Sequence, residues 1–301
     1  MDTTAAEYVA QRMPTVGIGT FQMRNEATLF KVIKKGIEIG YRMIDTAQCY
    51  GNERKIGDSI QRLLNPDSPD YDKLSRQVST SELFITSKVS PANQGKDKVE
   101  HSIRRSLANL QTEYLDLVLI HWPGTSKYDI RDPKNKELRR ETWLELERLY
   151  KEGLVRSIGV SNYEILHLTE LLEDYATVLP SVNQCEFHPF YANSTLLDFC
   201  KERGIQFQAY SSFGSPDGVH DLFSDPAIQE IAKKHNISVA EFLLAWALQQ
   251  KVCVLPRTGN LEHLETNWRS QNVILSSEEI DYVRQKDSNM KKYCWNPSSV
   301  V

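Results

Sequence analysis

Four side chains that together can move a proton to a substrate oxygen lie far apart in this sequence: Asp45, Tyr50, Lys88 and His121. Lys88 stands inside the apolar run FITSKV, where an ammonium group needs a partner, and the carboxylate of Asp45 is suited to that role. A nearby ammonium favours the phenolate, so we expect Lys88 to lower the pKa of Tyr50 from the usual phenol value of about 10. The four side chains thus combine a proton donor, a cation that tunes it, a carboxylate that holds the cation, and an imidazole that hydrogen-bonds a substrate oxygen.

Further polar side chains stand where the predicted strands end. They are Ser161 and Asn162 after IGV, Gln184 within VNQCE, Tyr210 and Ser211 after QFQA, and Arg257 after VCVLP. In a closed barrel of parallel strands the carboxyl ends meet at one face, where barrel enzymes place their sites. We therefore expect all these side chains to share one pocket with the first four.

The elements that must position these residues follow from a repeating pattern. Eight short apolar runs are too continuous for a strand with one face in water, and they predict buried parallel strands at 15–18, 42–45, 83–89, 115–121, 157–160, 182–186, 206–210 and 252–256. Segments with helical periodicity lie between or after them, at 31–40, 56–64, 99–110, 137–153, 165–175, 195–204, 227–235 and 239–250.

This alternation predicts an α/β fold, a (β/α)8 TIM barrel of parallel strands with its site at the C-terminal face, formed by a single domain over residues 1–301. An open dinucleotide-binding sheet is the alternative, but its fingerprint GxGxxG lacks the third glycine in VGIGT, so we interpret that segment as the first strand. Two stretches, 65–77 and 123–136, predict long loops, and the tail 291–301 is expected to lie without helix over the barrel mouth.

Composition excludes several function classes. A net charge of -4 and a pI near 6.0 give no basic footprint for nucleic acid, and no apolar run is long enough to span a membrane. The five cysteines are widely scattered, without a metal-ligand spacing or CxxC pair, and predict reduced thiols. We expect a cytoplasmic protein, a monomer or weak dimer, without a nucleic-acid or membrane partner.

The chain resembles the aldo-keto reductase family over nearly its whole length. The matching stretches, in order, are GIGTFQ, IDTAQCYGNE, ITSKV, LDLVLIHWP, IGVSNY, NQCEFHPF, AYSSFGS and VLPRTGN. The resemblance implies that Asp45, Tyr50, Lys88 and His121 form the catalytic tetrad and that no metal is needed. It also implies reduction of a small-molecule aldehyde or ketone by hydride from NAD(P)H, with Tyr50 protonating the alkoxide and His121 orienting the carbonyl oxygen.

The resemblance further implies where the cofactor binds. Ser161, Asn162 and Gln184 would hold the nicotinamide carboxamide, Tyr210 would stack on the ring, and Ser211, Ser212 and Phe213 would contact the pyrophosphate. At the adenosine end the common lysine-serine pair is Arg257-Thr258, a downstream arginine is replaced by His263, and Asn267 is retained after Thr266. Because a guanidinium can bind a 2′-phosphate through two hydrogen bonds, NADPH is preferred, with NADH as the alternative.

Four aromatic residues are candidates for the wall of the substrate pocket, with a place in the hydrophobic core as the alternative for each: Phe21, Trp122, Phe187 and Trp295. Of these, Phe21, Trp122 and Trp295 are the residues that we expect in the pocket. Ser90 and Pro91 follow the third strand where many relatives carry a large aromatic residue, which predicts a wider pocket, whereas His188 is interpreted as structural.

Two other functions stay open from the sequence. One is an aldolase-type barrel in which Lys88 forms a Schiff base, and the other is a cofactor-binding regulatory or structural subunit without turnover.

Overall fold

A parallel sheet of eight strands, in the order β1 to β8, forms the centre of the computed structural model, which describes residues 3–71, 78–285 and 290–301. The strands are β1 Ile18–Gly19, β2 Met43–Asp45, β3 Phe84–Val89, β4 Leu117–Ile120, β5 Ile158–Ser161, β6 Val182–Glu186, β7 Gln206–Tyr210 and β8 Cys253–Val254. All eight predicted strands are confirmed, with ends that shift by up to three residues. The start of β1 differs most from the prediction, at residue 18 instead of 15. Of residues 15–17, only Val16 forms a bridge to another strand.

The sheet closes on itself through the segment at β1, which makes it a barrel. Val16 forms a parallel bridge with Val254, and the Gly19 N–H donates to Pro256 O at 3.1 Å. A Cβ at Gly19 would lie 2.6 Å from Leu255 O, so only glycine lets the two backbones approach this closely. Gly19 of VGIGT therefore serves barrel closure, and the prediction of a first strand there is confirmed.

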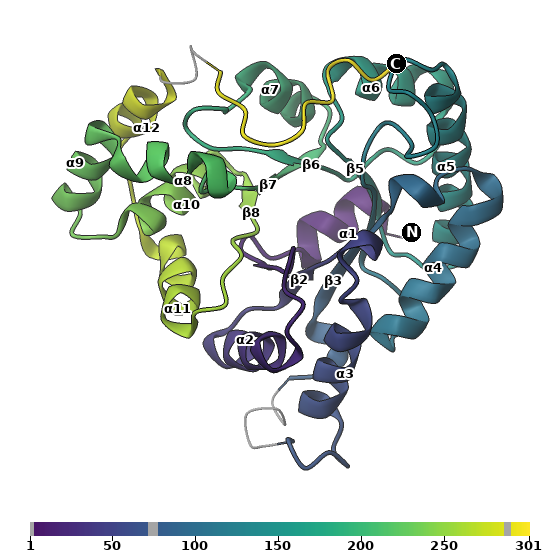
Figure 1. Cartoon of the computed structure of the whole chain (residues 1–301), viewed down its shortest axis with the longest axis horizontal. Coiled ribbons are helices and arrows are strands. Elements are labelled where there is room, and N and C mark those ends of the chain that lie inside the picture. The colour runs from purple at the N-terminus through teal and green to yellow at the C-terminus, as the bar shows by residue number, and fades with distance from the viewer. Residues whose placement is uncertain (1–2, 72–77, 286–289) are drawn as a thin grey trace.

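Helices surround the strands (Figure 1). They are α1 Ala5–Arg12, α2 Glu26–Ile39, α3 Glu53–Leu64, α4 Lys96–Leu110, α5 Lys134–Lys151, α6 Ile165–Glu170, α7 Ser194–Glu202, α8 Ser215–Ser224, α9 Pro226–Lys234, α10 Val239–Leu248, α11 Leu261–Arg269 and α12 Ser277–Arg284. The sequence did not predict α1, α8, α11 and α12, which have eight to ten residues each and bury few side chains. Within the described chain, no helix is both long enough and apolar enough to cross a membrane.

The barrel interior changes from apolar to polar along the strands. Near the strand N-termini, a cluster of buried side chains includes Met43, Phe84, Leu117, Leu119, Val182 and Leu255. Side chains two or four residues further along a strand point to the same side, because the strand period is two. Asp45, Lys88, His121 and Gln184 stand at those positions, so the same alternation that fills the core directs them into the C-terminal mouth.

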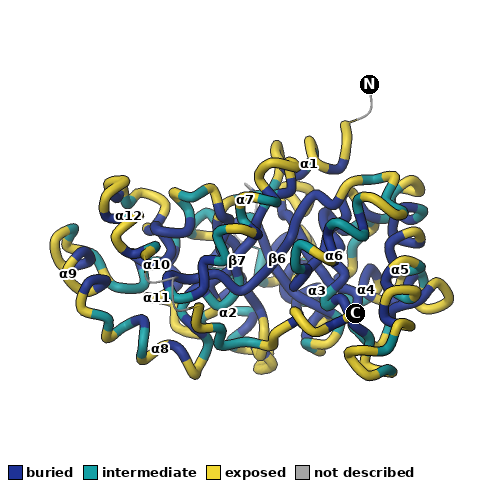
Figure 2. Tube along the Cα trace, turned by 90° about the horizontal axis from the view of Figure 1, so that it is seen from above, coloured by how far each residue is buried: buried dark blue, intermediate teal, exposed yellow. Residues whose placement is uncertain are grey.

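Helix α1 covers the apolar end of the barrel, on the opposite side from the C-terminal residue (Figure 2). Val9 of α1 is buried in the interior cluster, and Tyr8 packs against it. The Tyr8 hydroxyl donates to Asp116 Oδ1 at 2.6 Å, while the other oxygen of Asp116 accepts the Ile85 N–H at 2.8 Å. This hydrogen bond ties the first helix to two strands.

The tail 291–301 has no helix and runs along the C-terminal rim, from the end of β6 to the loop after β4 (Figure 1). At its start, Glu186 accepts the Tyr293 N–H at 2.6 Å and pairs with Lys292 at 2.9 Å. At its other end, the Val301 N–H donates to Ile130 O at 3.0 Å. The predicted loop 123–136 is confirmed up to Pro133, where α5 follows, whereas the predicted loop 65–77 lies partly outside the described residues.

We expect Tyr8→Phe to lower the free energy of unfolding by about 2 kcal/mol, because it leaves a buried oxygen of Asp116 without its donor. Urea unfolding followed by circular dichroism measures the change. The control is Tyr282→Phe, which removes a hydroxyl from a residue that is 53% exposed on α12 and should change the free energy little. Equal stabilities for Tyr8→Phe and the wild type would contradict the proposed contribution of this hydrogen bond.

Candidate active site

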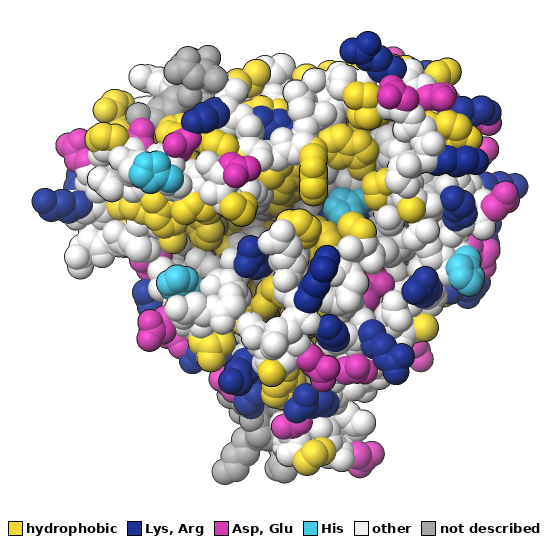
Figure 3. Space-filling model, viewed as in Figure 1, with side chains coloured by type: hydrophobic (Ala, Val, Ile, Leu, Met, Phe, Trp, Pro, Cys, Tyr) yellow, Lys and Arg dark blue, Asp and Glu magenta, His cyan; other side chains and the backbone are white. Residues whose placement is uncertain are grey.

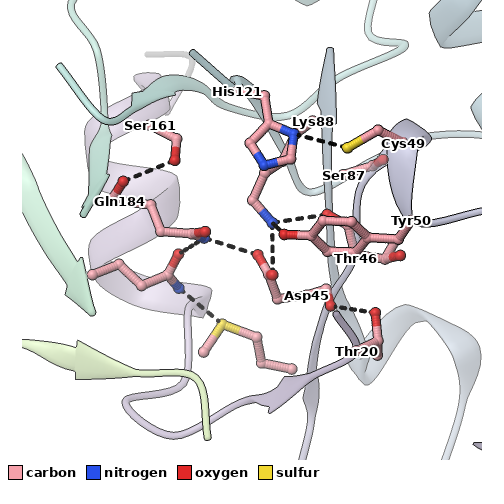
Figure 4. A network of polar contacts seen from close by, with 12 residues as sticks. Thr20, Asp45, Thr46, Cys49, Tyr50, Ser87, Lys88, His121, Ser161 and Gln184 are labelled. Carbon is pink, nitrogen blue, oxygen red and sulfur yellow. Dashed lines mark hydrogen bonds and ion pairs between the residues drawn. The ribbon is translucent and has the colours of Figure 1, made fainter. Parts of the chain in front are cut away.

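A buried ion pair forms the base of the site (Figure 4). Lys88 Nζ lies 2.6 Å from Asp45 Oδ1, with the Lys88 side chain fully buried and that of Asp45 6% exposed. Lys88 Nζ also donates to Thr46 O at 2.9 Å, and Asp45 Oδ2 accepts Gln184 Nε2 at 2.8 Å. Both charges are therefore paired and hydrogen-bonded, as burial requires. The predicted partnership of Lys88 with Asp45 is confirmed.

Tyr50 lies above this pair, at the end of a single 3-10 turn, Gln48–Tyr50. Its hydroxyl is 3.5 Å from Lys88 Nζ, and its ring makes edge contacts with His121 at 5.6 Å and with Phe21 at 5.1 Å between ring centroids. The phenol therefore stands between the buried ammonium and the mouth of the barrel.

The expected lowering of the Tyr50 pKa by Lys88 is wrong. Burial raises the pKa of Tyr50 well above its ordinary value, and the negative charge of Asp45 acts in the same direction. The ammonium of Lys88, 3.5 Å from the phenol oxygen, does not reverse this. Tyr50 is thus a neutral phenol that carries its proton at physiological pH.

His121 is a neutral imidazole beside the phenol. Burial, and secondarily the positive charge of Lys88, lower the pKa of His121 to about 3. Its Nδ1 lies 3.5 Å from Cys49 Sγ. A neutral ring presents one donor and one acceptor nitrogen, so His121 can hydrogen-bond a substrate oxygen without competing as an acid.

A second group of polar side chains connects β5, β6 and β7. Ser161 Oγ donates to Gln184 O at 2.8 Å, and Asn162 Nδ2 donates to Ser161 Oγ and to His121 O, both at 3.0 Å. The Tyr210 hydroxyl donates to Asn162 Oδ1 at 2.6 Å. The structure therefore brings together four of the residues that the sequence assigned to the cofactor, and the Gln184–Asp45 hydrogen bond connects them to the first group.

The loop after β7 continues this surface. Ser211 has a left-handed backbone (φ 52°), and its hydroxyl lies 2.6 Å from that of Ser215 and 3.3 Å from Cys294 Sγ of the tail. Phe213 packs on Phe223, at 5.9 Å between ring centroids. The Ser212 hydroxyl is buried without a hydrogen-bond partner among the described residues, which leaves a donor unused at this loop.

Four residues expected at the adenosine end lie outside the polar groups described so far: Arg257 and Thr258 in the loop after β8, and His263 and Asn267 on α11. Arg257 and His263 are exposed, and Asn267 is buried. Thr258 Oγ1 accepts the Asn260 N–H at 3.0 Å, which shapes the turn that begins α11. Arg257 forms no ion pair with any described residue, so its guanidinium is available to an anion.

The aromatic residues divide between the rim and the core. Phe21 is 43% exposed and touches Tyr50, Trp122 is half-buried next to His121, and Trp295 of the tail is 72% exposed. Phe187 is fully buried and stacks on Trp246 at 5.2 Å, so it belongs to the hydrophobic core, the alternative that the sequence left open for it. Figure 3 shows the face of the molecule seen in Figure 1, where a histidine side chain lies in a hollow near the centre, surrounded by hydrophobic side chains.

Comparison with known proteins agrees with this geometry. The model of the aldo/keto reductase family matches residues 15–288. The chain belongs to this family. Aldo-keto reductases are oxidoreductases that act on carbonyl compounds, so this reaction class applies to the chain.

Individual relatives resemble this aldo-keto reductase along most of their length. The chain is 39% identical to a glyoxal reductase of Bacillus subtilis over 271 residues, which cover 90% of this chain and 88% of the relative. It is 35% identical to a 9,11-endoperoxide prostaglandin H2 reductase of Trypanosoma cruzi, over 93% of this chain and 90% of that protein. Among solved structures, an aldo-keto reductase from a Medee basin deep-sea metagenome library has a TM-score of 0.82 at 32% identity, with 95% of each chain covered.

Sequence reasoning missed three residues of this aldo-keto reductase that contact the site or its rim. They are Cys49 beside His121, Gln208 beside Gln184, and Glu186 beneath the tail. Gln208 and Glu186 had a usable signal, because each is a polar residue at an inward-facing position of a strand. The interpretation of His188 as structural agrees with its place, since its Nε2 lies 3.1 Å from buried Glu186 Oε1.

A low pKa of His121 predicts a specific pH dependence of stability. The unfolded chain binds this proton near pH 6.5 and the folded chain only near pH 3, so the unfolded state gains protons first and stability falls as pH drops below 6.5. Between pH 7.5 and 5.5 the wild type should lose about 1 kcal/mol more than His121→Asn, measured by urea unfolding at each pH. The control His220→Asn, at an exposed position of α8, should keep the wild-type dependence; equal losses in wild type and His121→Asn would refute a depressed pKa.

Proposed function

We propose that this chain reduces aldehydes and ketones to alcohols with a nicotinamide cofactor, NADPH in preference to NADH, and that Tyr50 is the general acid. The observation that carries the proposal is the protonated phenol of Tyr50 next to the neutral ring of His121 at the mouth, with Lys88 Nζ 3.5 Å from the phenol oxygen. Membership of the aldo/keto reductase family supports the reaction class.

The residues along the mouth fit such a cofactor by their unused hydrogen-bonding groups. The buried Ser212 hydroxyl has no partner among the described residues, which suits a phosphate oxygen. Gln184 Oε1 accepts no hydrogen bond from any described residue, which suits a carboxamide N–H. Ser161, Asn162, Gln184 and Tyr210 would hold the nicotinamide end, and Arg257 with Thr258, His263 and Asn267 the adenosine end. The bound cofactor would supply the hydride.

The protein's own groups would perform the proton transfer. His121 hydrogen-bonds the carbonyl oxygen, and Tyr50 donates its proton to that oxygen as negative charge develops there. A phenol with a raised pKa keeps its proton until this charge appears. The phenolate that remains is stabilised by the ammonium of Lys88, which Asp45 and Thr46 O hold in place.

The same contacts disfavour a Schiff base on Lys88. Its three N–H donors face Asp45 Oδ1, Thr46 O and the Tyr50 hydroxyl, at 2.6, 2.9 and 3.5 Å. An ammonium engaged in this way has no free electron pair to attack a carbonyl carbon. Trapping with borohydride in the presence of an aldehyde should therefore leave the mass of the protein unchanged.

We expect Tyr50→Phe to lower kcat for aldehyde reduction by about 100-fold or more, with NADPH affinity within a few fold of wild type, because the phenol serves only the proton step. Steady-state NADPH consumption and fluorescence titration of the cofactor measure the two effects. Tyr114→Phe, remote from the mouth, is the control. Near wild-type turnover in Tyr50→Phe would remove this residue from the mechanism, and NADPH binding without consumption in the wild type would favour a binding subunit.

Arg257→Ala should weaken NADPH binding by about 10-fold or more and leave NADH binding nearly unchanged, because only NADPH carries the 2′-phosphate. Dissociation constants from fluorescence titration test this difference. Arg105→Ala, which removes an equal charge from an exposed position of α4, controls for net charge. Parallel losses for both cofactors would show that Arg257 does not recognise the phosphate.

A further inference from the structure

Gln208 is a buried polar residue in the interior of the barrel, deeper than the proposed tetrad. It is fully buried in β7 and faces Gln184 of β6 directly, since the two are register partners. Gln184 Nε2 donates to Gln208 Oε1 at 2.7 Å. Gln208 Nε2 in turn points to two thioethers, Met43 Sδ at 3.5 Å and Met13 Sδ at 3.7 Å. Figure 4 shows this chain of contacts continuing from Asp45 through Gln184.

The direction of this hydrogen-bond chain is fixed at both ends. A thioether sulfur and a carboxylate can only accept hydrogen bonds. The amide nitrogen of Gln208 must therefore face the methionines, which turns its oxygen toward Gln184. The amide nitrogen of Gln184 must face both this oxygen and Asp45 Oδ2, at 2.7 and 2.8 Å. Flipping either amide would place two donors or two acceptors against each other.

The two N–H groups of the Gln184 side-chain amide are both engaged within the barrel. Gln184 Nε2 carries two hydrogens, and Gln208 and Asp45 use both. No N–H of Gln184 remains for a ligand, whereas its Oε1 accepts no hydrogen bond from the described residues. Gln184 can thus offer a ligand only an acceptor.

We propose that Gln208 is a positioning residue, which makes Gln184 present its carbonyl oxygen alone to the N–H of a nicotinamide carboxamide. This inference rests on the proposed cofactor and adds a residue that never touches it. Without the acceptor of Gln208, only Asp45 Oδ2 still holds the Gln184 amide, so the amide can pivot about that hydrogen bond and turn its second N–H toward the mouth. The site then accepts either a donor or an acceptor, and recognition of the carboxamide is lost.

The experiment compares two ligands of the full chain by fluorescence titration, so its readout is binding rather than turnover. One is NADPH, and the other is its analogue with an acetyl group in place of the carboxamide, which keeps the carbonyl oxygen but has no N–H. The wild type should bind the analogue roughly 10-fold more weakly, because a buried acceptor stays unpaired. Equal affinities in the wild type would overturn the proposal.

Variants of Gln208 then test its part in this discrimination. In Gln208→Met, which has a similar length but no acceptor of comparable strength, the affinity ratio should fall toward 1. Gln208→Glu keeps an oxygen facing Gln184 and should retain the wild-type ratio. Gln206→Met is the matched control on the same strand, because Gln206 bonds Lys251 O and Phe207 O and does not contact Gln184. A wild-type ratio in Gln208→Met would overturn the proposal.

Two further outcomes separate the possible failures. Thermal melting shows whether each variant is folded, and Gln208→Leu is a second variant that lacks the acceptor. If neither Gln208→Met nor Gln208→Leu melts cooperatively, Gln208 serves the stability of the barrel and the positioning role is overturned. If the wild type binds NADPH but does not distinguish the analogue, only the role of Gln208 fails. If the wild type binds no NADPH, the proposed function itself fails, and the inference fails with it.

Discussion

The buried ion pair of Lys88 and Asp45 is the constraint on which the rest of the mouth depends. An unpaired charge at this depth would cost several kcal/mol, so the barrel must supply a partner at short range and donors for the remaining oxygen. Asp45 and Lys88 stand on the neighbouring strands β2 and β3, and Gln184 reaches Asp45 from β6 on another side of the barrel. Because each strand must be in register to meet these contacts, the ion pair links closure of the barrel to the geometry of the site.

Burial also sets the protonation states of Tyr50 and His121, which lie above the ion pair. It disfavours the charged form of each, so Tyr50 keeps its proton and His121 does not take one. Desolvation and the negative charge of Asp45 act on the pKa of Tyr50 in the same direction and raise it. A neutral acid beside a neutral hydrogen-bonding ring is suited to a substrate oxygen that becomes negative only during reaction.

Both ends of the barrel are covered by segments from the ends of the described chain. Helix α1 packs on the apolar end through Val9 and Tyr8, whereas the tail is held at the polar end by Glu186. Burial by itself raises the pKa of Glu186, but the hydrogen bonds from His188 and the Tyr293 N–H and the charge of Lys292 lower it to about 2. The carboxylate therefore stays charged and keeps the tail on the rim. The apolar end thus contributes packing, and the polar end collects the groups that can meet a ligand.

The sequence alone determined the order of the strands, the closed barrel and the identity of the polar residues at its mouth, because alternation and residue type are local properties of the chain. It also predicted that Lys88 and Asp45 meet, since a lysine in a buried strand requires an acid. Only the tertiary structure decided the direction of the Tyr50 pKa shift, the place of Phe187 in the core and the orientation of Gln184 by Gln208. Each of these depends on the distances among several strands at once, and on how much water they exclude, which no single stretch of sequence contains.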